Sequence, residues 1–263
     1  MQNLQLALQH FGKKKLTDGV AVLSFSTLFA IVPTFVLAFS VFSLSPYFAE
    51  LQIHLENFLF QQLVPQNYEN IITYIRQFIG SAQKIKGVSM LFLFLVVILL
   101  FREIDKRINF IWDGTKNRHL GKGVALYVIS LILMPLFLGL SLFASSYIAK
   151  SDIFVFIPMG GILISSLPII LSGIGVGVLY YASPLKTPSV KNAIKAGILA
   201  AFFLEVIKSI MLIYINYFPL YELIYGTMSA LLLFMLWVYF SWFIILLGGC
   251  YCYILEQKDG EDV

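Results

Sequence analysis

The sequence predicts an all-α integral membrane protein, a bundle of six transmembrane helices with both ends of the chain in the cytoplasm. Of its 263 residues 59% are hydrophobic and only 12% are charged, whereas soluble domains average about 25% charged residues. A soluble domain of this length would need a charged surface that this chain lacks. The net charge of +4 comes from short clusters between long apolar runs, a pattern typical of membrane topology rather than of nucleic-acid binding. Lipid is therefore expected to cover most of its surface.

The apolar runs give the positions of the spans. A helix needs about 20 apolar residues to cross a hydrocarbon core of about 30 Å. Such runs predict transmembrane helices at about residues 20–44, 85–106, 123–149, 154–182, 194–218 and 224–254. The charge-free part of the second is short, but Phe101, Ile104, Ile108 and Ile111 keep an apolar stripe at helical spacing. We therefore expect this helix to continue to about Trp112.

Lysine and arginine fall unevenly on the two sides of this bundle. Thirteen of the 18 lie on the side of the two termini, and only Arg76, Lys84, Lys86 and Lys150 lie on the other. Cytoplasmic loops carry the excess of basic residues, so both termini should be cytoplasmic.

Two segments outside the spans complete a single membrane domain of residues 1–263. The outer connection 46–86 spaces its apolar residues at helical intervals, which predicts two short amphipathic helices. Residues 256–263 are predicted to form a short, disordered polar tail.

Small residues predict close helix packing in the second half of the chain. Gly173, Gly175 and Gly177 lie inside one apolar run, while Ala193, Gly197 and Ala201 repeat every four residues in the next. This spacing lets the backbones of two helices approach closely.

Motifs along most of the chain, from about residue 10 to 255, resemble those of one family. In the first half they are Asp18-Gly19, the run STLFAIVP at 26–33, FREID at 101–105, Asn109 and Trp112. In the second half they are Tyr181-Ala182-Ser183-Pro184, Glu205, Lys208, Tyr225-Gly226, Trp237, Tyr239 and Ser241-Trp242. In their order and spacing these residues are similar to the YihY/BrkB family of bacterial inner-membrane proteins. One departure is Gly248-Gly249-Cys250, where many members have Gly-Ala-Glu.

The resemblance implies a multi-pass protein of the bacterial plasma (inner) membrane. It carries over no assigned molecular activity, since members were once labelled ribonuclease BN and have since been discussed as transporters.

The residues themselves favour no enzyme, no metal and no cofactor. The three histidines, His10, His54 and His119, lie in separate segments, so they do not form the convergent ligand set that metal-dependent hydrolysis needs. Cys250 and Cys252 would point about 200° apart on a helix, which favours packing roles over a disulfide or metal pair. We expect no ribonuclease activity.

The first candidate site is a charged pair inside the fifth span. Glu205 and Lys208 are three residues apart and share a helix face. A lone charge at the bilayer centre costs at least about 2.5 kcal/mol, so such residues are candidates for function. The alternative is that the two neutralise each other and only fix packing. In either case we expect them to face the interior of the bundle and to be coupled, to each other or to a charge on another helix.

The second candidate is a polar cluster at the cytoplasmic end of the second span. Its members are Asp18, Arg102, Glu103, Asp105, Arg107 and Asn109. The pair Glu103 and Arg107 has the favourable i,i+4 order. One interpretation is a solvated helix end that sets orientation. The other is that Arg102 and Asp105 face the bundle and line the mouth of a cavity, with Asp18 joining as a helix cap or partner.

Two functions from different classes fit these features. The first is transport or flipping of an anionic solute or lipid through a polar cavity. The second is a structural or assembly role, in which the chain binds another membrane protein or a second copy of itself. In both cases the lipid bilayer is its surroundings, and an anionic lipid or small anion is the ligand expected for the first.

Overall fold

The computed structural model describes residues 2–42, 77, 80–81, 88–112, 160–217, 226 and 228–261. Within these ranges the chain is all-helical, with α1 (Gln2–Lys13), α2 (Leu16–Phe42), α5 (Val88–Ile111), α7 (Gly160–Ala182), α8 (Val190–Tyr217) and α10 (Met228–Glu261). The predicted span at 123–149 lies outside the described residues. So does the connection predicted to hold two amphipathic helices, apart from residues 77, 80 and 81.

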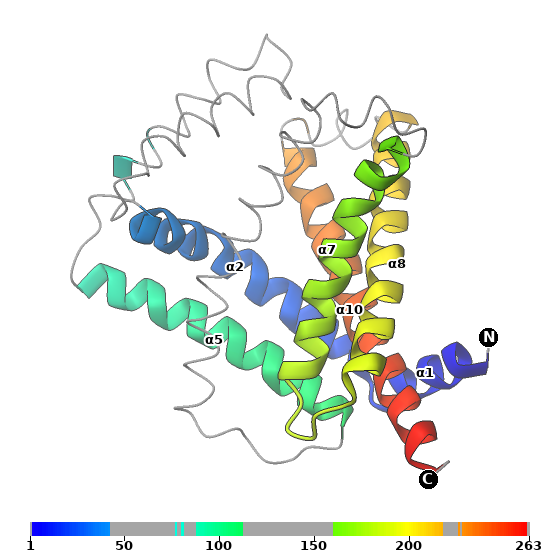
Figure 1. Ribbon diagram of the computed structural model, residues 1–263. Helices are drawn as coiled ribbons and strands as arrows, with labels where there is room; N and C mark the ends of the chain where they lie inside the picture. The colour runs from blue at the N-terminus through cyan, green and yellow to red at the C-terminus, as the bar shows by residue number, and fades with distance from the viewer. Residues whose placement is uncertain are drawn as a thin grey trace.

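The long helices form two antiparallel pairs that share α10. Helices α2 and α5 lie side by side, α7 and α8 form the second pair, and α10 contacts both pairs (Figure 1). Trp242 of α10 donates a hydrogen bond from Nε1 to Thr27 Oγ1 of α2 at 2.8 Å. On the other side, the buried Tyr180 hydroxyl of α7 donates to the Ile245 carbonyl at 2.6 Å. Helix α10 is therefore the common packing partner of the described helices.

Helix α5 is continuous through its charged part, as its apolar stripe predicted. It runs from Val88 to Ile111 without a break at Arg102. Ile104, Ile108 and Ile111 are buried, and Phe101 is half-buried. A loop could not keep this period, so the burial explains why the helix extends beyond the apolar run.

Glycine and alanine bring α7 and α8 together, as predicted. A Cβ placed on Gly197 would lie 2.4 Å from the carbonyl oxygen of Gly173 and 2.6 Å from the amide nitrogen of Gly177. Ala193 and Ala201 are buried beside it. The backbones meet so closely that only glycine fits at residue 197.

The helix α1 was not predicted from the sequence. Ala7 and Phe11, four residues apart, bury one face of α1, and Phe11 contacts the Phe243 ring of α10 at a centroid distance of 5.0 Å. These two residues give an otherwise polar segment one apolar face, and this face packs against α10.

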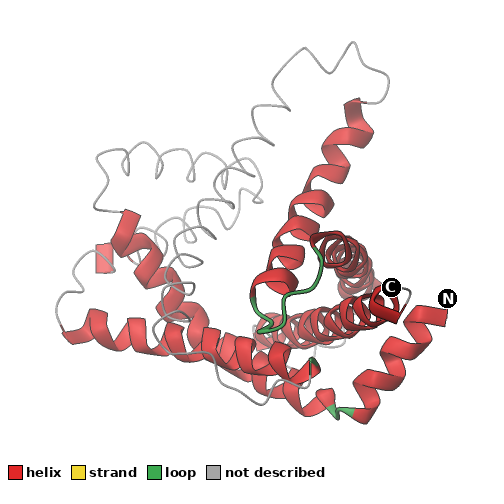
Figure 2. Cartoon of the chain, turned by 60° about the horizontal axis from the view of Figure 1, so that its bottom comes forward, coloured by secondary structure: helices red, strands yellow, loops and turns green. Residues whose placement is uncertain are grey.

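The prediction of a disordered tail is wrong for residues 256–261, because α10 continues to Glu261. Lys258 donates to Asn3 Oδ1 at 2.7 Å, so the end of α10 lies beside α1, and both termini are close together (Figure 2). The tail is helical because its polar side chains have partners on other helices.

Two of the described helices contain stretches long and apolar enough to cross a membrane: Leu16–Thr34 in α2 and Leu231–Gly260 in α10. A shorter apolar stretch, Ser172–Ala182, lies in α7.

Candidate functional site

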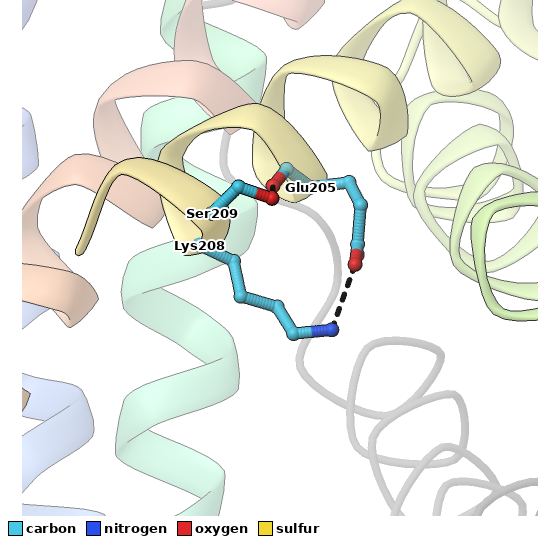
Figure 3. A network of polar contacts seen from close by, with 3 residues as sticks. All are labelled: Glu205, Lys208 and Ser209. Atoms are coloured by element: carbon cyan, nitrogen blue, oxygen red, sulfur yellow. Dashed lines mark hydrogen bonds and ion pairs between the residues drawn. The ribbon is translucent and has the colours of Figure 1, made fainter. Parts of the chain in front are cut away.

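The charged pair of α8 is coupled, as predicted. Lys208 Nζ donates to Glu205 Oε1 at 2.8 Å, and the Ser209 hydroxyl donates to the Glu205 carbonyl at 2.9 Å (Figure 3). Both interactions stay within α8. The pair is thus neutralised one turn along the same helix and needs no charge from another element.

The expected interior position of this pair is wrong for the arrangement of the described residues. The side chain of Glu205 is 39% exposed and that of Lys208 is 52% exposed. The pair is exposed because neighbouring helices cover only part of α8. Its buried side chains gather before the pair, at Asn192, Ala193, Ala196, Ala200 and Ala201, and beyond them Met211 is the one buried residue among the described side chains of α8. The pair lies past the region where α7 and α10 pack.

At the end of α5 the structure forms one of the contacts that the sequence predicted. Arg107 Nε donates to Glu103 Oε1 at 2.7 Å, and both side chains are about three-quarters buried. The Arg107 side chain lies against Gly19 of α2, where an added Cβ would be 3.2 Å from Arg107 Cδ. The ion pair therefore belongs to the contact between α2 and α5.

The remaining charges of this cluster do not converge on one cavity. Asp105 is 7% exposed and faces the packed helices, which agrees for this residue with the second of the two interpretations. Arg102 is exposed, which agrees with a solvated helix end and not with the interpretation that it lines the mouth of a cavity. Residues three apart differ by only about 60° around a helix, so Asp105 lies on the packed side of α5 while Arg102 lies at the exposed edge of that side. Asp18 is exposed in the first turn of α2, where a carboxylate suits the helix dipole.

Asn109 connects α5 to the turn between α7 and α8. Its Nδ2 donates to the Ser183 carbonyl at 2.9 Å and to the Asp105 carbonyl at 2.9 Å. Its Oδ1 accepts a hydrogen bond from the Leu185 amide at 2.8 Å. One buried side chain thus satisfies a carbonyl and an amide of a turn that has no helical partners for them.

A second polar group, missed from the sequence, holds the start of α8. Glu256 Oε2 accepts from the Ser189 amide at 2.9 Å, from the Ser189 hydroxyl at 3.1 Å and from Asn192 Nδ2 at 2.9 Å. Asn192 also donates to Asp259 Oδ2 at 2.8 Å. A carboxylate of α10 therefore caps α8 where amide groups lack intrahelical acceptors.

Replacing Glu256 by alanine should lower the thermal midpoint of the purified protein. The change removes the acceptor of three hydrogen bonds at a helix N-terminus, where loss of a cap costs about 1 kcal/mol. The control is Gln257→Ala, since Gln257 is exposed and its side chain bonds to Tyr253 on the same helix. Equal midpoints for the two variants would contradict a capping role.

The N-terminal helix is held to α5 and α10 by His10, a residue that no local pattern in the sequence singles out as structural. His10 Nε2 lies 3.0 Å from the Ile111 carbonyl at the end of α5. Its ring stacks on Tyr253 with a centroid distance of 4.6 Å. Trp112 contacts the same tyrosine ring edge-on at 5.9 Å.

Among the described residues, no three histidine, cysteine or carboxylate side chains lie together where they could hold a metal ion. Cys250 and Cys252 are buried free thiols, which agrees with packing roles.

Comparison with known proteins identifies the family. The family model described as "Virulence factor BrkB" matches residues 7–262. A UPF0761 membrane protein of Aggregatibacter aphrophilus is 33% identical over 257 residues, covering 96% of this chain and 91% of the relative. Its counterpart in Haemophilus influenzae is 31% identical over 259 residues, covering 97% and 95%. One in Pseudoalteromonas translucida is 33% identical over 251 residues, covering 94% and 84%. No solved structure matches the chain.

The apolar helices and the relatives define a membrane protein that is all-helical in its described part. The chain belongs to the BrkB family, which confirms the family indicated by the motifs from Asp18 to Trp242.

Proposed function

We propose that this membrane protein moves or flips an anionic solute or lipid, with Lys208 as the cation that receives it. The carrying observation is the position of the Glu205–Lys208 pair. It lies near the middle of α8, and its neighbours Phe202, Val206 and Ile210 are exposed apolar side chains. The surroundings of the pair are therefore apolar, and a charge there is costly unless it is paired.

Such an ion pair binds a ligand when an anionic group of the ligand replaces the carboxylate as the partner of the lysine. A lysine ammonium in apolar surroundings binds whichever anion is nearest, and a phosphate or carboxylate of a ligand can replace Glu205 as that anion. Glu205 then takes Lys208 back when the ligand leaves. Because both side chains are partly exposed, neither helix packing nor a buried partner has to change during this exchange.

The topology belongs to the same proposal. We propose six spans in the plasma (inner) membrane, with both termini in the cytoplasm. The support is that exposed lysines of the α1–α2 turn, the end of α5 and the start of α8 lie at one end of the molecule, with the termini (Figure 1). They are Lys13, Lys15, Lys106, Lys186 and Lys191. Basic residues mark the cytoplasmic side.

The second candidate function is a structural or assembly role, alone or with another membrane protein. It is favoured by the same ion pair, because Glu205 and Lys208 satisfy each other within one helix. In that role the ion pair only lowers the free-energy cost of placing two charged side chains in apolar surroundings.

Exchange of the pair separates the two functions. In proteoliposomes we would measure flipping of a fluorescent phosphatidylglycerol, and in detergent the shift of the thermal midpoint with added anions and lipids. For transport, Glu205→Gln with Lys208→Met should keep the midpoint but abolish flipping. Each single change should leave a lone charge that costs about 2.5 kcal/mol or more in apolar surroundings and lower the midpoint.

Ser209→Ala is the matched control. Its hydroxyl bonds to the backbone of α8, so the variant should flip lipid like the wild type. If the double exchange leaves flipping and ligand shifts intact, the pair is structural. If the wild type neither flips lipid nor responds to any anion, transport is refuted and the assembly role stands.

A further inference from the structure

Exposed side chains of α5 form a stripe that changes in character along the helix. The stripe consists of Leu91, Leu95, Leu99, Arg102, Lys106 and Phe110, all exposed. These positions fall within about 100° of one another around a helix of about 3.6 residues per turn. One face of α5 therefore carries three leucines, then two cations, then an aromatic ring.

Of the two acidic residues of α5 near these cations, one is paired with another residue and the other is buried. Glu103 is held by Arg107 at 2.7 Å, and Asp105 is buried on the packed side of α5. Arg102 and Lys106, four residues apart, repel each other and destabilise the isolated helix by about 0.2–0.5 kcal/mol. An anion placed between them would turn this repulsion into attraction.

The length of the leucine part of the stripe indicates the kind of molecule to which that anion belongs. From Leu91 to Arg102 the helix rises by about 16 Å, at about 1.5 Å per residue. One leaflet of the hydrocarbon core is about 15 Å thick, half of the whole. The leucine part of the stripe is thus about as long as one leaflet is thick, and the two cations follow directly after it, as a phosphate follows an acyl chain.

The far end of the stripe also suits the head-group region. The Lys14 ammonium lies over the Phe110 ring, 4.9 Å from its centroid. Lysine side chains near a helix end typically extend to the level where lipid meets water.

We propose that this stripe binds one anionic phospholipid of the leaflet nearest the chain termini. Its phosphate lies between the Arg102 guanidinium and the Lys106 ammonium, and an acyl chain lies along Leu99, Leu95 and Leu91. The guanidinium can donate two parallel hydrogen bonds to the phosphate, while the ammonium acts as a point charge. This site is separate from the Glu205–Lys208 pair and does not require that the protein transports anything.

The test uses the full chain in a mild detergent with three probes: dioleoylphosphatidylglycerol, dioleoylphosphatidylcholine and inorganic phosphate. Phosphatidylglycerol should raise the thermal midpoint with a saturable dependence, as a ligand of the folded state does. Neither phosphatidylcholine nor phosphate should do so at the same concentration. Native mass spectrometry should show one retained phosphatidylglycerol per chain.

The matching variant is Arg102→Gln with Lys106→Gln, which should weaken the apparent affinity for phosphatidylglycerol by about tenfold or more. The control Lys13→Gln with Lys186→Gln removes the same charge from the same end of the molecule, at exposed positions outside the stripe. It should bind like the wild type. If the first variant fails to fold, Lys106→Gln alone carries the comparison.

Three results would overturn the proposal. Equal shifts with phosphatidylcholine would mean that no charge is recognised. Equal shifts with inorganic phosphate would mean that the ligand is a free anion rather than a lipid. Equal weakening in the stripe variant and the control would mean a general attraction between net charges. None of these results depends on a flipping assay.

Discussion

Alanine at residue 197 should unfold the α7–α8 pair and leave little purified protein. The added methyl group would lie 2.4 Å from the Gly173 carbonyl oxygen and 2.7 Å from Gly177 Cα. These are backbone atoms of α7 and cannot turn away as a side chain can, so the helices have to separate. Overpacking typically costs about 1–3 kcal/mol, and we expect Gly197→Ala at the top of that range or above it. The measurements are the thermal midpoint and the monodisperse yield.

Gly175→Ala is the control for this prediction. Gly175 lies on the same pair of helices, but an added Cβ there meets no atom within 4 Å. Alanine is the better helix former by about 1 kcal/mol, so this variant should match or exceed the stability of the wild type. If Gly197→Ala were as stable as Gly175→Ala, the close approach of α7 and α8 would be wrong.

Replacing Asn109 by leucine should be the most damaging polar-to-apolar change in the described part of the chain. Leucine has the same branched arrangement of heavy atoms, although it is larger, but it cannot bond to the Ser183 carbonyl or the Leu185 amide, which Asn109 contacts at 2.9 and 2.8 Å. A buried backbone group left without a partner costs about 1–3 kcal/mol, and two are affected here. The thermal midpoint should fall by several degrees, since 1 kcal/mol corresponds to about 2–4 °C at this size.

Two further variants test whether the loss of stability comes from the lost hydrogen bonds between Asn109 and the turn between α7 and α8. Ser241→Ala removes a hydroxyl that donates to the Trp237 carbonyl within α10, so its effect should be small. Asn109→Asp can still accept from the Leu185 amide but cannot donate to Ser183 when ionised, so it should be destabilised like Asn109→Leu. Full stability of Asn109→Asp would contradict the role of the amide group as a donor.

Local patterns in the sequence predicted the local parts of this fold. The stripe from Phe101 to Ile111 predicted that α5 continues beyond its apolar run, because side-chain burial on a helix repeats every three to four residues. The spacing of Gly197 between Ala193 and Ala201 predicted a close approach of backbones. The i,i+3 spacing of Glu205 and Lys208 predicted their ion pair.

Contacts between distant segments could not be predicted in this way. Sequence patterns place Glu256 in a polar tail, because its partners, Ser189 and Asn192, lie 67 and 64 residues earlier. The segment of α1 has too few apolar residues to indicate a membrane helix, and its packing depends on Phe243 of α10. The exposure of Lys208 depends on where α7 and α10 stop covering α8. None of these relations has a signature within one stretch of sequence.

The central place of α10 has a consequence for how the molecule is made. Helices α1, α2, α5, α7 and α8 all contact α10, yet the ribosome synthesises α10 after all of them. The pairs α2–α5 and α7–α8 can form as soon as their members are inserted, because the partners follow one another among the described helices. The polar and small-residue surfaces with which these pairs contact α10 then remain uncovered in the bilayer. They are covered only when α10 is inserted with Trp242, Ile245 and Glu256. A translational pause before residue 228 would prolong the life of this half-assembled intermediate, the stage most open to membrane proteases and insertion factors.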